Sequence, residues 1–233
     1  SFLVLGPLVA RLGRARVPLP GGCAIGARPV DLHLKGLEAL GARIEEHDGV
    51  VDVTADRLRG ARIELAFPSV GATEHLAMTA TLAEGMTEIV NAAIEPEVLD
   101  LVDLLRRMGA EIDVEGRTVR VAASRLGAAE HTLIPDRMEA GTMLLAAAIS
   151  RGEATADDVA PEDLRPLSDA LRRAGVDVCE GERSVTVSAG GTLRGTAVET
   201  APHPGFPTDL HPPIAALLTL AGGTSRITET VFE

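Results

Sequence analysis

Three segments of this chain share one pattern of residue types at nearly constant spacing. Each starts at a proline, continues with apolar residues at helical spacing and reaches a glycine that precedes a short strand-like run. The three glycines are Gly41, Gly109 and Gly175, which are 68 and 66 residues apart. Self-similarity at a fixed period is typical of a supersecondary unit that is repeated along a chain. We therefore expect the fold to be assembled from copies of one such unit.

The residues within a repeat predict the order of its helices and strands. Proline suits the first position of a helix, and glycine suits the left-handed position after the last turn. A short strand, a turn such as Asp48-Gly49 and a second, alternating strand follow each glycine. Alanine-rich helices, expected at 70–83, 138–150 and 209–221, lie between the repeats and lead into a further strand. The predicted fold class is α/β (α+β) with repeated β-α-β-α-β-β units, and the helix at 70–83, apolar on most faces, should be buried.

The composition limits the classes of protein to which the chain can belong. With 233 residues, 45% of them hydrophobic, it is long enough for one large or two smaller domains. Its net charge is −12 and it has no lysine- and arginine-rich run, which argues against a nucleic-acid partner. No apolar run approaches the roughly 20 residues of a membrane span, and two cysteines do not make a disulfide framework. We expect a cytoplasmic protein without a membrane partner.

Cys23 lies in a glycine-rich loop, five residues before Arg28. A thiol reacts as its thiolate, and a nearby guanidinium or helix N-terminus lowers the pKa of a thiol. The loop glycines let the backbone approach a ligand closely, and Pro29 suits the first position of a helix whose N-terminus favours anions. One interpretation is a reactive cysteine beside an anion site. The other is a small hydrophobic side chain in a turn, because buried free cysteines are common.

Eight strings spread along the chain form one further pattern. The most specific is Pro20-Gly21-Gly22-Cys23-Ala24-Ile25-Gly26-Ala27-Arg28-Pro29. The strings occupy residues 5–11, 20–33, 68–74, 91–93, 95–97, 134–142, 204–209 and 227–233. Together they resemble the UDP-N-acetylglucosamine enolpyruvyl transferases (UDP-N-acetylglucosamine 1-carboxyvinyltransferases), and the resemblance covers essentially the whole chain. The related enolpyruvyl-shikimate-phosphate synthases share the repeat but not the cysteine loop.

The resemblance implies a fold of the inside-out α/β barrel type, with two domains that each contain three repeat units around inward-packed helices. Residues 1–134 would form most of the cysteine-loop domain, about two units, and residues 135–233 the first part of the second domain, about one and a half units. The implied reaction transfers the enolpyruvyl group of phosphoenolpyruvate to the 3-hydroxyl of UDP-N-acetylglucosamine and releases phosphate. In this family it is the first committed step of bacterial peptidoglycan biosynthesis and uses no cofactor or metal.

The resemblance also implies roles for individual residues. Cys23 would be the general acid, would carry phosphoenolpyruvate as a covalent adduct and would be alkylated by fosfomycin. Arg28 would contact phosphoenolpyruvate or phosphate, and Val231 would touch the sugar nucleotide. Asp209 would hold and help deprotonate the sugar hydroxyl; its other interpretation is a helix N-cap after Pro-Thr. The residues implied to line the uridine-diphosphate site are Arg28, Pro29, Val30, Asp31 and Leu32, with Phe67, Pro68, Ser69 and Val70.

The chemistry of the reaction calls for such groups independently of the family. Addition of a hydroxyl to an enol ether needs a proton donor for the methylene carbon and a base near the attacking oxygen. A departing phosphate needs arginine or backbone N–H groups where negative charge develops. Cys23, Asp209 and Arg28 can supply these three functions, and no metal or cofactor is required.

The chain departs from the family pattern at two places and in its extent. Ile94 stands where the family usually has an arginine before Glu-Pro, and His211-Pro212-Pro213 replaces a glutamine-rich helix start. A little over half of the family's length is covered, without the N-terminal Lys-Asn pair or the C-terminal phosphate-site arginine. We therefore expect a fragment, cut at both ends, that is inactive or nearly so by itself. The alternative is a non-catalytic repeat domain that binds a nucleotide sugar or serves as a scaffold.

The remaining cysteine and three histidines have simpler interpretations. Cys179, at the end of a strand, is expected to be inert packing. His47 and His131 occupy turn-like positions and are expected on the solvated surface. His33 lies on the helix that follows the cysteine loop, where it is either a site-lining or a structural residue.

Overall fold

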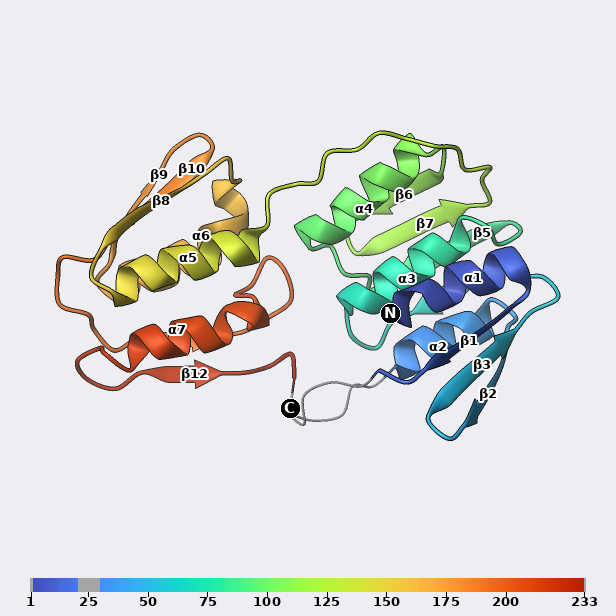
Figure 1. Ribbon diagram of the computed structural model, residues 1–233, viewed down its shortest axis with the longest axis horizontal. Helices are drawn as coiled ribbons and strands as arrows, with labels where there is room; N and C mark the ends of the chain where they lie inside the picture. The colour runs from blue at the N-terminus through green and yellow to red at the C-terminus, as the bar shows by residue number, and fades with distance from the viewer. Residues whose placement is uncertain (1, 21–29, 233) are drawn as a thin grey trace. The chain divides into compact units, whose positions relative to one another are not determined.

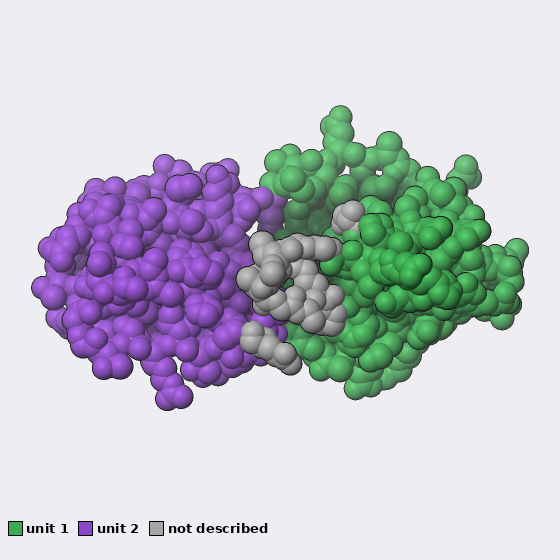
Figure 2. Space-filling view, turned by 60° about the horizontal axis from the view of Figure 1, so that its bottom comes forward, with its two compact units in different colours: residues 1–133 green, residues 134–233 purple. Residues whose placement is uncertain are grey.

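The computed structural model describes residues 2–20 and 30–232 of the chain (Figure 1). The predictions for Cys23, Arg28 and Pro29 lie outside the described residues. The chain divides into two compact units, Ser1–Leu133 and Ile134–Glu233, which are coloured separately in Figure 2. We call them unit 1 and unit 2 and describe each by itself.

Unit 1 contains helices and strands in an alternating order (Figure 1). Its elements are η1 (Phe2–Val4), α1 (Leu5–Leu12), β1 (Arg14–Pro18), α2 (Asp31–Ala39), β2 (Arg43–His47), β3 (Val50–Thr54), β4 (Arg62–Glu64), α3 (Val70–Ala80), β5 (Met86–Val90), α4 (Pro96–Arg107), β6 (Glu111–Glu115) and β7 (Thr118–Ala122).

Unit 2 repeats part of the same order. Its elements are α5 (Arg137–Ile149), β8 (Glu153–Asp157), α6 (Pro161–Arg173), β9 (Asp177–Glu180), β10 (Ser184–Ser188), β11 (Ala197–Glu199), η2 (Thr208–Leu210), α7 (His211–Leu218) and β12 (Arg226–Thr228).

The run from β4 to β7 is one complete β-α-β-α-β-β unit, which confirms the predicted order. Its sheet has the order β4-β5-β7-β6, with β4 parallel to β5 and the other pairs antiparallel. The other repeats form antiparallel sheets of order β1-β3-β2 and β8-β10-β9. Strands β11 and β12 pair in parallel, as β4 and β5 do. The strands β2, β6 and β9 therefore lie at sheet edges.

The repeat glycines end helices α2, α4 and α6 in the same way. Gly41, Gly109 and Gly175 have φ values of 95°, 103° and 87°, which confirms their predicted position after the last helical turn. In α2, the Gly41 N–H donates to the Glu38 carbonyl at 2.9 Å and the Ala42 N–H donates to the Leu37 carbonyl at 3.0 Å. Helix α2 begins at Asp31, and Val30 is its N-cap.

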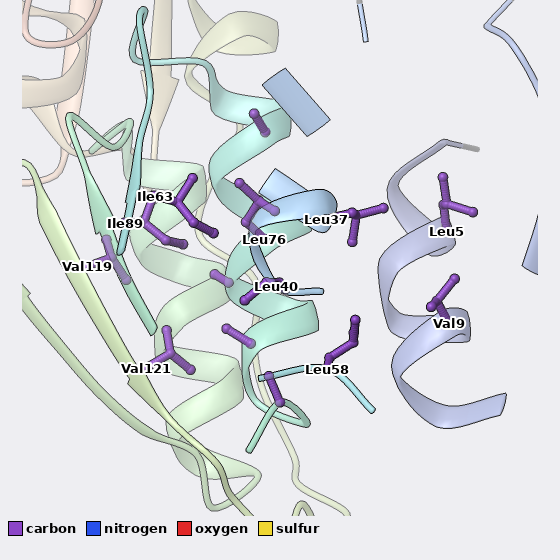
Figure 3. Packing of buried hydrophobic residues seen from close by; sticks show 14 of the residues in the cluster. Leu5, Val9, Leu37, Leu40, Leu58, Ile63, Leu76, Ile89, Val119 and Val121 are labelled. Carbon is purple, nitrogen blue, oxygen red and sulfur yellow. The ribbon is translucent and has the colours of Figure 1, made fainter. Parts of the chain in front are cut away.

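Helix α3 lies at the centre of unit 1, as its apolar sequence predicts. It contacts α1, α2 and α4 and also strands β5 and β7. Figure 3 shows Leu76 of this helix among Leu37 and Leu40 of the α2 segment and the β-strand residue Ile89. Gly6 of α1 permits the closest approach, because a Cβ at that position would lie 1.9 Å from Thr79 Oγ1. A helix rather than a sheet thus occupies the middle of this unit.

Unit 2 has its own core of buried residues from α5, α6, α7 and the β8-β10-β9 sheet. Helix α7 forms with Pro212 and Pro213 in its first turn, where a missing N–H has no helical acceptor to lose. It starts at His211 because Thr208–Leu210 form the 3₁₀ turn η2, which places the start two residues after the predicted one. Ile214 and Leu217 of α7 are fully buried.

Two predictions about isolated side chains are wrong. Cys179 is exposed on the edge strand β9 and is not part of the packing. His131 is not solvated, because only 7% of its side chain is exposed and its Nε2 lies 2.9 Å from Asp100 Oδ1. His47 is exposed, as predicted. None of the helices within residues 2–20 and 30–232 is both long enough and apolar enough to cross a lipid bilayer.

Candidate active site

The first turn of α2 carries three of the predicted nucleotide-site residues. Val30 is the N-cap, and its carbonyl accepts the Leu34 N–H at 3.0 Å. Asp31 is exposed and accepts a hydrogen bond from Lys35 Nζ at 3.0 Å, which lowers the pKa of the Asp31 carboxyl. Leu32 is half-buried and packs against the unit 1 core. This turn therefore presents the Asp31 carboxylate to solvent.

The start of α3 carries the other predicted nucleotide-site residues. Ser69 is the N-cap, and its Oγ accepts the Ala72 N–H at 3.3 Å. Thr73 Oγ1 donates to the Ser69 carbonyl at 2.8 Å, and the Ser69 N–H donates to the Phe67 carbonyl at 2.8 Å. Pro68 and Val70, like Phe67 and Ser69, are half-buried. The positive end of the helix dipole at this N-terminus favours a bound anion.

Two histidines join the starts of α2 and α3. His33 Nδ1 of α2 lies 3.1 Å from His75 Nδ1 of α3, and the Phe2 ring packs against both imidazoles. The edge of the His33 ring faces Gly71, since a Cβ at Gly71 would lie 3.4 Å from His33 Cε1. The two helix starts are thereby held beside each other, and with them the residues 30–32 and 67–70.

Hydrogen bonding sets the tautomers of these histidines. The Gly6 N–H donates to His75 Nε2 at 2.7 Å, so that nitrogen carries no proton. The proton of neutral His75 is then on Nδ1 and is donated to His33 Nδ1, which leaves the proton of His33 on Nε2. Burial, with a smaller contribution from His33, lowers the pKa of His75 to about 3, and burial also lowers the pKa of His33. Both rings are therefore neutral at pH 7.

In unit 2, Val231 and the residue before Asp209 both donate hydrogen bonds to one carboxylate, that of Glu229. Asp209 is exposed within η2, and the N-cap of α7 is Leu210, so the N-cap interpretation of Asp209 is wrong. Val231 is half-buried and its N–H donates to Glu229 Oε1 at 2.7 Å. Thr208, the residue before Asp209, donates its hydroxyl to Glu229 Oε2 at 2.8 Å.

Sequence reasoning assigned no role to His75 or Glu229. His75 interrupts an otherwise small and apolar helix, which is a signal, but its donor Gly6 is 69 residues away. Glu229 stands between two threonines, and a glutamate in such a run is typical of the solvent-facing side of a β-strand. Burial of Glu229 would raise its pKa, but hydrogen bonds from Thr200, Val231 and Thr208 outweigh that effect and lower it to about 2.

A surface hollow of about 460 Å³ lies beside Leu40 at the end of α2, away from the predicted site residues. Three arginines line the hollow: Arg43 pairs with Asp56 at 3.7 Å, Arg57 pairs with Glu84 at 2.5 Å, and Arg59 is the third. In the described part of the chain, no three His, Cys, Asp or Glu side chains are grouped as a metal site requires.

The family described as EPSP synthase (3-phosphoshikimate 1-carboxyvinyltransferase) matches residues 1–233. The chain belongs to this family. Among solved structures, the enolpyruvyl transferase NikO from Streptomyces tendae has a TM-score of 0.82 and 28% identity, covering 97% of this chain and 55% of its own. This likeness confirms the predicted enolpyruvyl-transferase fold class. An EPSP synthase from Acinetobacter baumannii has a TM-score of 0.63 at 17% identity and is alike in fold alone.

Relatives within the EPSP synthase family are closer in sequence. UDP-N-acetylglucosamine 1-carboxyvinyltransferase 2 of Carboxydothermus hydrogenoformans is 52% identical over 237 residues, covering 100% of this chain and 57% of its own. UDP-N-acetylglucosamine 1-carboxyvinyltransferase 1 of Symbiobacterium thermophilum is 52% identical, with 54% of its length covered. The enzyme of that name from Finegoldia magna is 50% identical, with 56% covered. The chain thus spans about half the length of the curated relatives it matches, and their name agrees with the resemblance of the sequence strings.

Proposed function

We propose that this chain is part of an enzyme that transfers the enolpyruvyl group of phosphoenolpyruvate to the 3-hydroxyl of UDP-N-acetylglucosamine and releases phosphate. The observation that supports the proposal most is the identity of 50 to 52%, over the whole chain, to three proteins named UDP-N-acetylglucosamine 1-carboxyvinyltransferase. The reaction would serve peptidoglycan synthesis in the bacterial cytoplasm. Phosphoenolpyruvate and the UDP-sugar are the proposed small-molecule partners.

The proposed roles divide the reaction among three side chains. Asp209 accepts the proton of the sugar hydroxyl as its oxygen bonds to C2 of phosphoenolpyruvate, and Cys23 gives a proton to C3. The C2–O bond to phosphate then breaks, a proton leaves C3, and the double bond returns in the product. Arg28 stabilises the departing phosphate. Cys23 and Arg28 lie outside the described residues, so these two roles rest on the sequence strings.

The starts of α2 and α3 are the proposed nucleotide-binding surface. Its described residues are Val30, Asp31 and Leu32 at the start of α2 and Phe67, Pro68, Ser69 and Val70 at the start of α3. The sequence strings add Arg28 and Pro29, which lie outside the described residues. The N-terminus of α3 suits a phosphate group, because N–H groups in the first turn of a helix can donate to phosphate oxygens. Val231 of unit 2 is the proposed further contact to the sugar nucleotide. We assign residues 1–134 to most of the cysteine-loop domain and residues 135–233 to the first part of the second.

The test uses a chimera in which this chain replaces the matching segment of the Carboxydothermus relative. Phosphate release is measured with phosphoenolpyruvate and UDP-N-acetylglucosamine, separately and together. The folded chimera should release phosphate only when both are present, and Cys23→Ala or Asp209→Asn should abolish release. Cys179→Ser, at the exposed second cysteine, is the matched control and should retain it. The chain by itself should show little or no turnover.

Other outcomes would contradict the proposal. A folded chimera that binds UDP-N-acetylglucosamine without turnover would favour the non-catalytic binding domain. Release of phosphate with shikimate 3-phosphate but not with the UDP-sugar would favour the shikimate branch of the family. Mass measurement after fosfomycin treatment gives an independent readout, with one adduct expected on Cys23 and none in Cys23→Ala.

A further inference from the structure

Glu229 of unit 2 accepts hydrogen bonds from the two segments that carry the proposed site residues Asp209 and Val231. It follows β12, and its Oε1 accepts Thr200 Oγ1 at 2.7 Å, the Val231 N–H at 2.7 Å and the Phe232 N–H at 3.2 Å. Only 20% of its side chain is exposed. The backbone that ends in Val231 is therefore fixed by one oxygen of this carboxylate.

The second oxygen reaches the turn that carries Asp209. Glu229 Oε2 accepts Thr208 Oγ1 at 2.8 Å and lies 3.3 Å from His211 Nδ1. Thr208 and His211 flank Asp209 on its two sides in the chain, while Asp209 itself is exposed. The carboxylate thus fixes both ends of the short segment from which Asp209 projects.

Thr200 ties this arrangement to the parallel pair β11-β12. It is fully buried, and its N–H donates to the Thr228 carbonyl at 2.9 Å. Its Oγ1 also accepts the Thr230 N–H at 2.9 Å, while the Thr230 hydroxyl donates to the Thr200 carbonyl. These bonds hold the backbone on both sides of Glu229 against Thr200.

We propose that Glu229 is a positioning residue for the proposed transfer: its two carboxylate oxygens hold the Asp209 turn and the Val231 backbone in one fixed arrangement. The inference rests on the proposed function, because that function makes Asp209 the base and Val231 a contact to the sugar nucleotide. A carboxylate is suited to the task because, when ionised, it only accepts hydrogen bonds and can accept several at once. A fixed base matters because small displacements of catalytic groups slow reactions strongly.

Two substitutions separate positioning from folding. Glu229→Ala removes every acceptor, and it should lower kcat of the chimera by on the order of 100-fold through misplacement of Asp209. Glu229→Gln keeps one acceptor oxygen for the Val231 and Phe232 N–H groups, and its NH₂ can donate to the Thr208 hydroxyl after that hydroxyl rotates. Gln should therefore restore most of kcat. Glu199→Ala, at an exposed glutamate on neighbouring β11, is the matched control and should leave kcat unchanged.

An NMR readout on this chain reports the contacts directly. The amide proton signals of Val231, Phe232 and Asp209 should shift in Glu229→Ala and stay in place in Glu199→Ala. Thr208→Val, which removes only the link to the Asp209 turn, should shift the Asp209 signal, lower kcat and leave the KM for UDP-N-acetylglucosamine nearly unchanged.

The outcomes distinguish this inference from the proposed function. If the wild-type chimera releases no phosphate, the proposed function fails. The positioning inference is then tested by NMR alone, and it is overturned if the Asp209 and Val231 amide signals do not shift in Glu229→Ala. With an active chimera, wild-type kcat in Glu229→Ala overturns the inference alone. Should Glu229→Ala fail to fold, Thr208→Val decides: lower kcat supports the inference, and wild-type kcat overturns it.

Discussion

His75 is a fully buried imidazole whose charge state is coupled to folding. The Gly6 N–H donates to Nε2 of His75, and this nitrogen can accept the bond only when it carries no proton, so the ring must be neutral. His33 faces the other ring nitrogen, Nδ1. The pKa of His75 is about 3 in the folded chain, against about 6.5 for an unfolded histidine. Between these values the unfolded chain binds more protons, so stability falls as the pH falls from 6.5 toward 3.

Replacing His75 tests this coupling. The stability advantage of the wild type over His75→Asn should shrink by about 2 kcal/mol between pH 7.5 and pH 5, because only the wild type has this histidine to protonate on unfolding. Urea unfolding followed at the amide signals of α3 measures it. His47→Asn, at an exposed histidine of the same unit, is the control and should keep the wild-type pH profile. An equal pH profile for His75→Asn and the wild type would show that His75 is not held neutral.

Single residues were predictable where a local rule acts on them. Gly41 and Gly109 follow a helix, and the left-handed conformation there needs a residue without a side chain. Cys179 was mispredicted because the rule that free cysteines are buried is statistical, and β9 lies at a sheet edge. His75 bonds to Gly6, 69 residues away in the sequence, and Glu229 bonds to Thr200, 29 residues away. No local sequence pattern contains such pairs.

At the scale of elements, helix α5 begins at a side-chain cap. Asp136 Oδ1 accepts the Met138 N–H at 2.7 Å and the Glu139 N–H at 3.1 Å, which satisfies two otherwise unpaired donors. Asp136→Ala should destabilise unit 2 by about 1 kcal/mol. Urea unfolding followed at amide signals of unit 2 measures the loss. Glu130→Ala, at an exposed carboxylate of the preceding coil, should cost nothing, and an equal effect of both variants would exclude the cap as the cause.

Elements were predictable from periodicity, and their ends were less so. The second strand after each of Gly41, Gly109 and Gly175 alternates clearly enough to predict. Helix α7 begins two residues after its predicted start because the 3₁₀ turn η2 occupies residues Thr208–Leu210. Strands such as β4 and β12 have three residues each, too few for an alternation to be recognised.

At the scale of the whole molecule, the chain has two separate hydrophobic cores. Leu76 is fully buried in the unit 1 core, whereas Val185 and Val187 belong to the unit 2 core. Leu76→Ala should cost unit 1 about 2 to 5 kcal/mol through the cavity it leaves. Hydrogen exchange should accelerate at Val119 and Val121 and stay unchanged at Val185 and Val187. Equal acceleration in both units would show that they unfold as one cooperative body.

The repeat period predicts several copies of one unit, but it does not say whether a helix or a sheet fills the middle. The inside-out arrangement came from the resemblance to the enolpyruvyl transferases, supported by the apolar faces of residues 70–83. In the structure, α3 contacts three helices and two strands because small residues such as Ala72 and Ala80 let all of them approach. The Cys23 loop is the part of the proposed site for which the sequence strings are the sole support.

The edge strands β2, β6 and β9 have a consequence for crowded solutions. Each pairs with another strand on one side, which leaves a second side to which another chain could add a strand, and each also carries exposed carboxylates that repel such an addition. Replacing these carboxylates with neutral side chains should therefore lower the colloidal stability of the folded chain. The exposed acidic residues are Glu45 and Glu46 on β2, Glu111, Asp113 and Glu115 on β6, and Asp177 and Glu180 on β9.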